Sequence, residues 1–292
     1  MTSAVQIEAV SRRFRRCTAL RSVTATIPYG SVTALVGSNG AGKTTLLNLV
    51  TGLLTPSTGA ISLFDNLAPG SLEALGKVAY VAQDGPVSTS RTVGDAVHIA
   101  RAFNMLFDFD TAVVRLQRLD IDLKQRVSKL SGGQRAQLAI TLALARAPEL
   151  LVLDEPLSSL DPIARRDLLG ELMGHCADSG MTIIFSSHVI AELEKIASHL
   201  VLIKDGEAVV GGEIDELLEH HRIFTGTAAE AGLVHDGHGS VISQAHPLTL
   251  APRVIRFAVP PTGNALLTPV TLEDLTYAYL ERSPSGSGGP TK

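Results

Sequence analysis

Residues Val5 to Ala34 follow a strand-like pattern of hydrophobic and polar positions. β-Branched residues are frequent in this segment, and Pro28-Tyr29-Gly30 interrupts it as a turn. A shorter segment of the same kind runs from Ala60 to Phe64. We therefore expect an antiparallel entry sheet in the first part of the chain.

Later hydrophobic segments are nearly continuous, as in strands that are buried on both faces. Leu150 to Leu153 and Thr182 to Phe185 are of this kind, and a helical pattern from Pro162 to Cys176 separates them. This alternation is typical of a parallel sheet covered by helices on both faces. Lys77 to Ala82 is another β-type segment, and Asp205-Gly206 predicts a hairpin turn between Leu200 to Lys204 and Glu207 to Val210.

Helical patterns occupy the remaining parts of the first two thirds of the chain. They run from Lys43 to Val50, from about Thr92 to Leu130, and from Arg135 to Arg146. We expect a main domain over residues 3–220 with a helical insertion at about 86–135. Residues 221–282 are expected to form a small accessory region, and the Ser/Gly/Pro-rich residues 283–292 a disordered tail.

Composition narrows the class of protein. The chain is 45% hydrophobic and 18% charged, which excludes a disordered protein. Its most apolar stretch, Leu138 to Leu153, contains Arg146, Pro148 and Glu149 and is too short to cross a bilayer. No secretory or lipidation motif is visible at the start, so we expect a cytoplasmic protein.

Charge and cysteine content exclude further classes. A net charge of -4 gives no overall basic footprint for nucleic acid, and no nucleic-acid partner is expected. The two cysteines, Cys17 and Cys176, lack the spacing of a zinc site or a disulfide framework. His220, His221, His235 and His238 lie in polar loops without acidic or cysteine ligands at regular spacing, so they do not predict a metal site.

A glycine-rich segment between a strand and a helix fits the phosphate-binding pattern G-x-x-x-x-G-K-[ST]. Its residues are Gly37, Ser38, Asn39, Gly40, Ala41, Gly42, Lys43 and Thr44. Glycines let the backbone N–H groups point at phosphate oxygens, and the helix N-terminus adds positive partial charge. We expect Lys43 to reach the β- and γ-phosphates of a nucleotide and Thr44 to offer its hydroxyl to Mg²⁺.

Two adjacent acids, Asp154 and Glu155, end a strand that is otherwise apolar. Burying two charges costs free energy of folding, so such acids are expected to bind a metal ion or to transfer protons. We expect Asp154 to hold Mg²⁺ and Glu155 to polarise the attacking water as general base. Gln83 also follows a strand, where its amide could contact Mg²⁺ or water. His188 follows another strand and is expected at the same edge of the sheet as Glu155, with a purely structural role as the alternative.

A second Ser/Gly segment, Leu130-Ser131-Gly132-Gly133-Gln134, precedes the apolar helix at Arg135 to Arg146. Ser131 is placed as an N-cap, and the glycines free backbone N–H groups for an anion. One nucleotide has little use for two phosphate sites, so the second site would serve the nucleotide of a partner in a head-to-tail pair. An ordinary helix start is the alternative interpretation.

The order of these motifs resembles the nucleotide-binding subunits of ABC transporters, over roughly residues 3 to 220. The resemblance implies the following positions: an adenine-stacking aromatic at Phe14, the Walker A loop at Gly37 to Thr45, the Q-loop at Gln83, the signature at Leu130 to Gln134, Walker B at Leu150 to Asp154, the catalytic glutamate at Glu155, the D-loop at Ser158 to Asp161, and the switch histidine at His188. Thr45 and Asp161 thereby join the expected nucleotide-binding residues.

The resemblance also implies a fold and a way of working. The fold is an α/β P-loop ATPase core with a mostly parallel sheet, an antiparallel β entry subdomain, a helical insertion and a small C-terminal region. ATP would close a dimer with an identical or a different ATPase subunit, and hydrolysis would reopen it. An integral membrane permease would then change the side of the membrane to which it is open. The ATPase subunit would lie in the cytoplasm, on the inner face of the cell membrane.

The direction of transport rests on a softer resemblance. Residues Pro269 to Leu280 resemble the short terminal helix of exporter-type subunits, so we expect export of a drug, antibiotic, lipid or polymer, with an importer as the alternative. ABC ATPases that act on nucleic acid or ribosomes usually carry a coiled-coil arm, zinc cysteines or a second cassette, which this sequence lacks. A kinase or GTPase outside the ABC family would not explain the signature or the tandem acids.

A group of hydrophobic residues in the insertion has two interpretations. In the family this region contacts the membrane subunit, and exposed aromatics would suit such a contact. Burial in the insertion's own core is the alternative. The residues are Phe103, Met105, Leu106, Phe107 and Phe109.

Overall fold

The computed structural model of the protein describes residues 3–83, 87–187, 190–224, 239–242, 253–257 and 267–281. The chain forms two compact units, Met1–Gly211 and Gly212–Lys292. Within the described residues, no helix is both long enough and apolar enough to cross a membrane.

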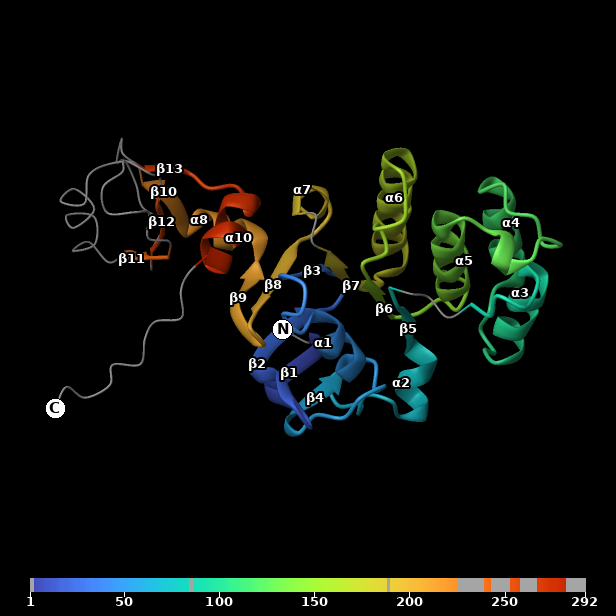
Figure 1. Ribbon diagram of the computed structural model, residues 1–292, viewed down its shortest axis with the longest axis horizontal. Helices are drawn as coiled ribbons and strands as arrows, with labels where there is room; N and C mark the ends of the chain where they lie inside the picture. The colour runs from blue at the N-terminus through green and yellow to red at the C-terminus, as the bar shows by residue number, and fades with distance from the viewer. Residues whose placement is uncertain are drawn as a thin grey trace. The chain divides into compact units, whose positions relative to one another are not determined.

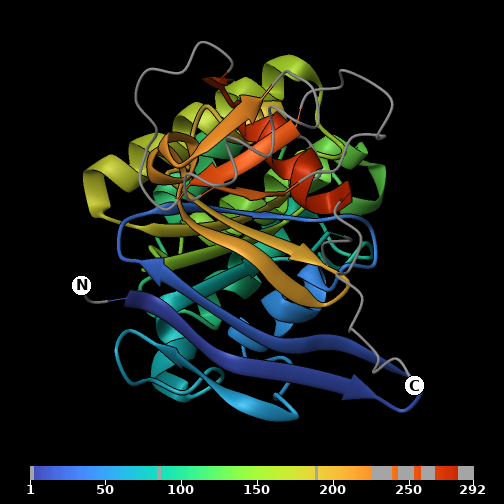
Figure 2. The same cartoon turned by 90° about the vertical axis from the view of Figure 1, so that its left-hand side faces the viewer.

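The first unit begins with the predicted antiparallel entry sheet. Strands β1 (Ser3–Phe14), β2 (Cys17–Pro28) and β4 (Thr58–Leu63) pair in the order β2-β1-β4. Figure 2 shows β1 and β2 as long neighbouring strands. Their inward side chains, including Ile7 and Leu20, are buried in one cluster with helix α1 (Lys43–Val50), because apolar side chains on one face of a sheet gain free energy by leaving water.

A six-stranded sheet forms the centre of the first unit, with the strand order β5-β6-β7-β3-β8-β9. The strands are β3 (Val32–Val36), β5 (Val78–Val81), β6 (Leu150–Asp154), β7 (Thr182–Ser187), β8 (His199–Lys204) and β9 (Glu207–Glu213). The first five strands in this order are parallel, so the carboxyl ends of β3, β5, β6 and β7 lie at one edge. This is the edge where open α/β sheets bind ligands.

Helices cover both faces of the central sheet, as the apolar strands predict. Figure 1 shows α1 and α6 (Pro162–Ser179) on opposite sides of it. Two shorter helices, α2 (Leu72–Lys77) and α7 (Ile190–Leu193), belong to the same unit. The predicted fold class is confirmed: a mostly parallel sheet with helices, an antiparallel entry sheet and a helical part.

The helical insertion is more divided than its sequence pattern indicates. The helical pattern predicted from about Thr92 to Leu130 is confirmed, and within it the chain forms α3 (Val93–Ala102), α4 (Phe109–Arg118) and the 3₁₀ turn η1 (Val127–Lys129). The side chain of Asp108 accepts a hydrogen bond from Thr111 N–H and so starts a new helix at Phe109. Helix α5 (Gly132–Leu144) follows and shares an apolar core with α3 and α4.

The five hydrophobic residues of the insertion divide between the two interpretations. Phe103, Met105 and Leu106 are among the most exposed large hydrophobic side chains, with 84%, 104% and 75% of their surface accessible. Phe107 is buried in the insertion's own core, and Phe109 is half-buried against it. The turn between α3 and α4 therefore presents three apolar side chains, close together in the sequence, to its surroundings.

The second unit contains a small antiparallel sheet with strand order β11-β12-β10-β13. Its elements are α8 (Ile214–Glu219), β10 (His221–Phe224), β11 (Gly239–Val241), β12 (Arg253–Phe257), β13 (Leu267–Pro269) and α10 (Leu272–Glu281). The predicted helix near the end of the chain is confirmed as α10. His235, His238 and residues 282–292 lie outside the described residues.

His221 connects three elements of the second unit, and it should make the stability of that unit depend on pH. The ring is fully buried: Nδ1 lies 2.6 Å from the carbonyl oxygen of Leu217, and Nε2 lies 3.0 Å from the Tyr279 hydroxyl. Burial is the main cause that lowers the pKa of His221 below its ordinary value of 6.5. The unfolded chain therefore binds this proton more readily, and the free energy of unfolding should decrease as pH falls below about 6.5.

Thermal unfolding at pH 5.5 and 7.5 checks this expectation. The melting temperature of the second unit's transition should be lower at pH 5.5, and His221→Gln should reduce the difference between the two pH values. An unchanged difference in the variant would show that other groups cause it.

Candidate functional site

The glycine-rich loop connects the carboxyl end of β3 to the N-terminus of α1. A Cβ atom on Gly37 would lie 2.3 Å from the carbonyl oxygen of Ile203, so a larger residue does not fit there. Gly42 is the N-cap of α1 and has φ of 111°, a conformation that side chains disfavour. No side chain caps this helix, which leaves its first N–H groups available to an anion.

Lys43 brings a positive charge to the wall of this loop. Its side chain is only 7% exposed, and its ammonium donates a hydrogen bond of 2.8 Å to the carbonyl oxygen of Gly37. The same nitrogen lies 3.7 Å from Oε1 of Glu155. The lysine thus lies between the loop and the acids at the end of β6.

Asp154 is the last residue of β6 and is 99% buried, with 1% of its surface exposed. Thr44 donates a hydrogen bond of 2.7 Å to its Oδ2, and Ser186 donates one of 2.5 Å to its Oδ1. A hydroxyl beside a carboxylate matches the hard oxygen ligands that Mg²⁺ prefers. Among the described residues, no group of three or more His, Cys, Asp or Glu side chains is placed to hold a metal ion.

Glu155 has an unusual backbone conformation. Its φ is 50°, in the left-handed region that few residues other than glycine adopt. The N–H of Glu155 donates to two oxygen atoms of Ser186, the carbonyl oxygen at 3.2 Å and the hydroxyl Oγ at 2.9 Å. Non-glycine residues in this region are concentrated at functional sites, where the surrounding structure holds them in place.

Tyr80 lies near the acids but is not a candidate base. Burial, with a smaller contribution from the charge of Asp154, raises the pKa of Tyr80 to about 12. The phenol therefore stays protonated at neutral pH.

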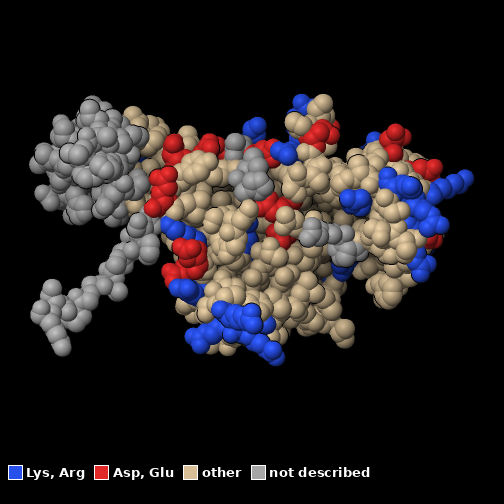
Figure 3. Space-filling model, viewed as in Figure 1, with Lys and Arg blue, Asp and Glu red and all other residues tan. Residues whose placement is uncertain are grey.

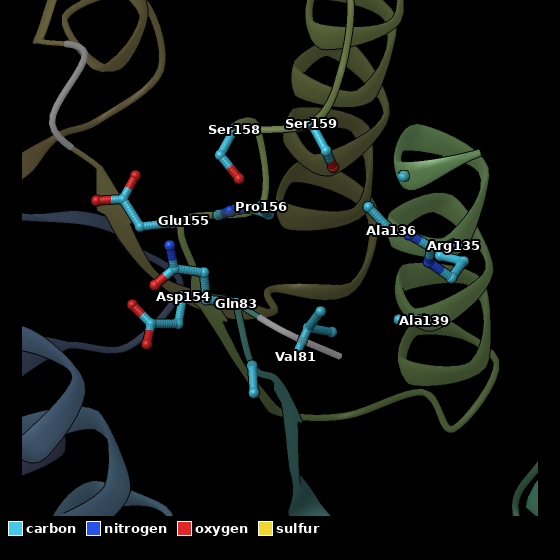
Figure 4. A pocket seen from close by; sticks show the side chains of 12 residues that line it. Val81, Gln83, Arg135, Ala136, Ala139, Asp154, Glu155, Pro156, Ser158 and Ser159 are labelled. Carbon is cyan, nitrogen blue, oxygen red and sulfur yellow. The ribbon is translucent and has the colours of Figure 1, made fainter. Parts of the chain in front are cut away.

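Two cavities meet at this edge of the sheet. One has a volume of about 410 Å³ and is lined by Ala19, Ser38, Asn39, Gly40, Gly42, Lys43, Thr44, Thr45, Gln83, Asp154 and Glu155. The other has a volume of about 290 Å³ and lies between the strand ends and α5. Figure 4 shows Asp154, Glu155 and Gln83 on one side of this second cavity and Arg135, Ala136 and Ala139 of α5 on the other.

The predicted N-cap of α5 is confirmed, and the helix begins at Gly132 rather than at Arg135. Ser131 accepts a hydrogen bond from the N–H of Gln134, and the Gln134 side chain accepts one from the N–H of Ser131. This capping box extends the helix by one turn toward the N-terminus. Among the described residues, none from Ser131 to Gln134 lines the larger cavity, so one chain does not bring both predicted phosphate sites to one pocket.

Comparison with known proteins agrees with this geometry. Residues 20–158 match the family model of the ABC transporter. The lantibiotic transport ATP-binding protein SrtF of Streptococcus pyogenes is 31% identical over 215 residues, which cover 72% of this chain and 91% of SrtF. This chain is an ABC transporter ATPase subunit. ABC ATPases bind and hydrolyse ATP to power transport, form dimers and act with membrane permease subunits.

Two further relatives show how widely the match extends. The molybdenum import ATP-binding protein ModC of Vibrio parahaemolyticus is 32% identical over 203 residues, which cover 67% of this ABC ATPase but only 54% of ModC. A solved structure of an ATP binding subunit of an ABC transporter has a TM-score of 0.66 at 25% identity and covers 74% of this chain and 92% of its own. The relatives include an import protein, so membership of the family does not give the direction of transport.

Phe14 and Asp161 of this ABC ATPase line neither of the two cavities. Phe14 ends β1, is 41% exposed, and has the guanidinium of Arg12 4.8 Å from its ring centre. Asp161 is the N-cap of α6, where Oδ1 accepts hydrogen bonds from the N–H groups of Ile163 and Ala164. His188 lies outside the described residues.

Ser186 is a functional candidate that the sequence reasoning missed. It pairs in register with Asp154 on the neighbouring strand, is fully buried, and contacts both acids through one hydroxyl. A serine at the end of an apolar strand was the available signal. The signal is weak, because the partner is 32 residues away and the register between β6 and β7 is visible only in the structure.

Ser186→Ala should therefore slow ATP hydrolysis by about tenfold, in line with the usual effect of removing a residue that orients a metal ligand. The Asp154 carboxylate would lose one of its two hydroxyl donors, and the Glu155 N–H would lose its side-chain acceptor. Steady-state kcat is the measurement. Ser31→Ala is the matched control, since Ser31 is also buried but its hydroxyl donates to Pro28. Equal kcat values for the two variants would contradict a role for Ser186.

Proposed function

We propose that this ABC ATPase hydrolyses Mg²⁺-ATP with Glu155 as general base, and that hydrolysis powers export through a separate integral membrane subunit. The observation that carries the chemical part is the convergence of Lys43, Thr44, Asp154 and Glu155 at the carboxyl edge of the central sheet. These groups supply a cation for phosphate, two oxygen ligands for a metal ion and a base for water.

Each side chain then has a separate task. Lys43 would compensate the charge of the β- and γ-phosphates, and Thr44 and Asp154 would hold Mg²⁺, which supplies electrostatic stabilisation to the transferring phosphoryl group. Glu155 would accept a proton from the attacking water as the water oxygen forms a bond to the γ-phosphorus and the bond from that phosphorus to the leaving oxygen of ADP breaks. Gln83 lines both cavities and would contact the ion or the water, and Phe14 would stack on adenine.

The ATPase would work as a head-to-tail pair with an identical or a different ATPase subunit. Support comes from α5, whose N-terminus carries Gly132 and Gly133 but does not border the larger cavity. A phosphate bound at this N-terminus would belong to the nucleotide of the partner. Two such sites would enclose two ATP molecules between the subunits, with Asp161 and the preceding loop near the contact.

Export is favoured by two observations. The chain covers 91% of the SrtF sequence but 54% of the ModC sequence, so its matched length is closer to that of the transport protein SrtF. The chain also has the short helix α10, which was expected for exporter-type subunits. We infer a position on the cytoplasmic face of the membrane, with a drug, antibiotic, lipid or polymer as the exported substrate.

The exposed side chains of Phe103, Met105 and Leu106 support a membrane subunit as partner, since three exposed apolar side chains in one turn between helices favour a protein contact. A nucleic-acid partner is less favoured. On the face shown in Figure 3, basic side chains lie in separate groups over the entry sheet and the insertion, with acidic side chains between them.

Copurification and transport in vesicles test this proposal. The tagged ATPase, extracted in detergent from its own cells, should bring down an integral membrane protein. The complex is then placed in vesicles with the ATPase outside, together with a panel of drugs, antibiotics and lipids. External ATP should drive the substrate into the vesicle lumen; movement outward would show an importer. Recovery of ribosomes or nucleic acid without a membrane protein would contradict a transport function.

A further inference from the structure

Arg115 of α4 is buried between three helices and uses all of its N–H groups there. The side chain is 7% exposed, and its Nε and Nη2 each donate to Glu171 of α6 at 2.7 Å. Nη2 also donates to Oε1 of Gln137 at 2.8 Å, and Nη1 donates to the carbonyl oxygen of Gln137 at 3.1 Å and to Thr141 Oγ1. One guanidinium thus joins the insertion, the signature helix α5 and helix α6.

The helices that Arg115 joins carry two segments of the proposed pair contact. Helix α5 begins with the signature glycines, and α6 begins just after the loop of Ser158 to Asp161. The two segments already approach closely at their ends, since a Cβ atom on Gly133 would lie 3.0 Å from the carbonyl oxygen of Ser159. Between the first turns of α5 and the strand ends, however, lies the cavity of about 290 Å³.

We propose that Arg115 is a positioning residue that holds the signature helix at a fixed distance and rotation relative to the loop 158–161. This proposal rests on the proposed function, in which the signature contacts the partner's nucleotide. Helix α5 packs on β5, but the cavity lies beside its first turns and gives no support there. At this end the helix is held by the Gly133 contact at its start and the Arg115 contact one to two turns later. These two contacts, together with the packing of α5 on β5, restrict both the direction and the rotation of the helix.

The chemistry of this cluster explains why an arginine is needed. Its planar fork makes a two-bond contact with the Glu171 carboxylate while its remaining N–H groups reach α5. A lysine at this position keeps the charge but cannot reach both helices in a fixed geometry. When α5 adopts other orientations, only a fraction of the subunits is competent to pair, and the apparent dimer affinity falls by that fraction.

The test compares variants in a Glu155→Gln background, where ATP is bound but not hydrolysed. Sedimentation equilibrium in Mg²⁺-ATP gives the dimer dissociation constant, which Arg115→Lys should raise about tenfold. Glu171→Gln should act in the same direction, and it is the safer variant for folding because the Glu171 side chain is 34% exposed. The double variant should be no weaker than Arg115→Lys alone, since both changes break one contact.

Three further measurements separate positioning from general damage. Mg²⁺-ADP affinity, measured by calorimetry, should not change, because no residue of the Arg115 cluster lines the larger cavity. Thermal unfolding shows whether each variant is folded. Glu149→Gln is the control: it breaks the ion pair with Lys77, which lies outside the insertion, and it should leave dimer affinity unchanged.

The outcomes distinguish this proposal from the one it rests on. Failure of the Glu155→Gln protein itself to pair in Mg²⁺-ATP would contradict the proposed pair. If that protein pairs and its folded Arg115→Lys and Glu171→Gln derivatives pair equally well, Arg115 has no positioning role. Additive effects of the two changes would also overturn the proposal.

Discussion

Replacing Glu155 with glutamine should lower kcat for ATP hydrolysis by about 10²–10⁴-fold, the usual contribution of a positioned general base. The amide has the shape of the carboxylate but cannot accept the proton of the attacking water. Nucleotide affinity should persist, because the loop from Gly37 to Thr44 is unaltered. A fall in kcat without a rise in the dissociation constant for ATP is the signature of a group that acts only in the chemical step.

Single-turnover hydrolysis and equilibrium binding of Mg²⁺-ATP measure the two quantities separately. Glu149→Gln is the matched control, since it makes the same chemical change in another glutamate. The Glu149 carboxylate pairs with the Lys77 ammonium, 3.1 Å away, and not with the groups around Asp154 and Glu155. Hydrolysis at the normal rate by the Glu155 variant would disprove its assignment as base.

Replacing Lys43 with alanine should weaken ATP binding by roughly a hundredfold, since a charged hydrogen-bond donor contributes about 1.5–3 kcal/mol. The ammonium is buried at the wall of the cavity, where a bound phosphate is poorly screened by water. Hydrolysis should also be lost, because the charge that develops on the γ-phosphate would be left without its cation. This variant therefore differs from the Glu155 variant, which keeps its affinity.

Calorimetric titration with Mg²⁺-ATP measures the effect of the Lys43 change. Lys77→Ala is the control: this lysine is one third exposed and pairs with Glu149, so its loss should leave ATP affinity unchanged. Wild-type affinity in the Lys43 variant would mean that the glycine-rich loop does not bind phosphate in the way proposed here.

The fold was largely predictable because its central strands carry local signals. Leu150 to Leu153 and Ile183 to Phe185 are apolar without interruption, as is typical of strands buried on both faces. The acids could be predicted as a pair for a similar reason, since charged residues rarely end a buried strand without a task. The glycine-rich loop is one continuous segment whose spacing is set by its own chemistry.

Features that depend on distant partners could not be predicted in this way. Ser186 is ordinary in sequence and becomes informative only when β7 pairs with β6 and places it against Asp154. Arg115 lies on an amphipathic helix where a charged residue normally faces water, and its partner Glu171 is 56 residues later. The N-cap at Ser131 is local and was predicted, whereas the return hydrogen bond from the Ser131 N–H to the Gln134 side chain is visible only in the structure.

The most direct test of the account mixes two inactive forms of the protein. Lys43→Ala removes the phosphate-binding lysine, and Ser131→Arg places a bulky side chain at the N-terminus of α5. We predict that neither variant hydrolyses ATP alone. An equal mixture should recover roughly a quarter of the wild-type rate, because random pairing makes half of the dimers mixed and each mixed dimer has one complete site. Full hydrolysis by the Ser131 variant alone would contradict a site shared between two subunits.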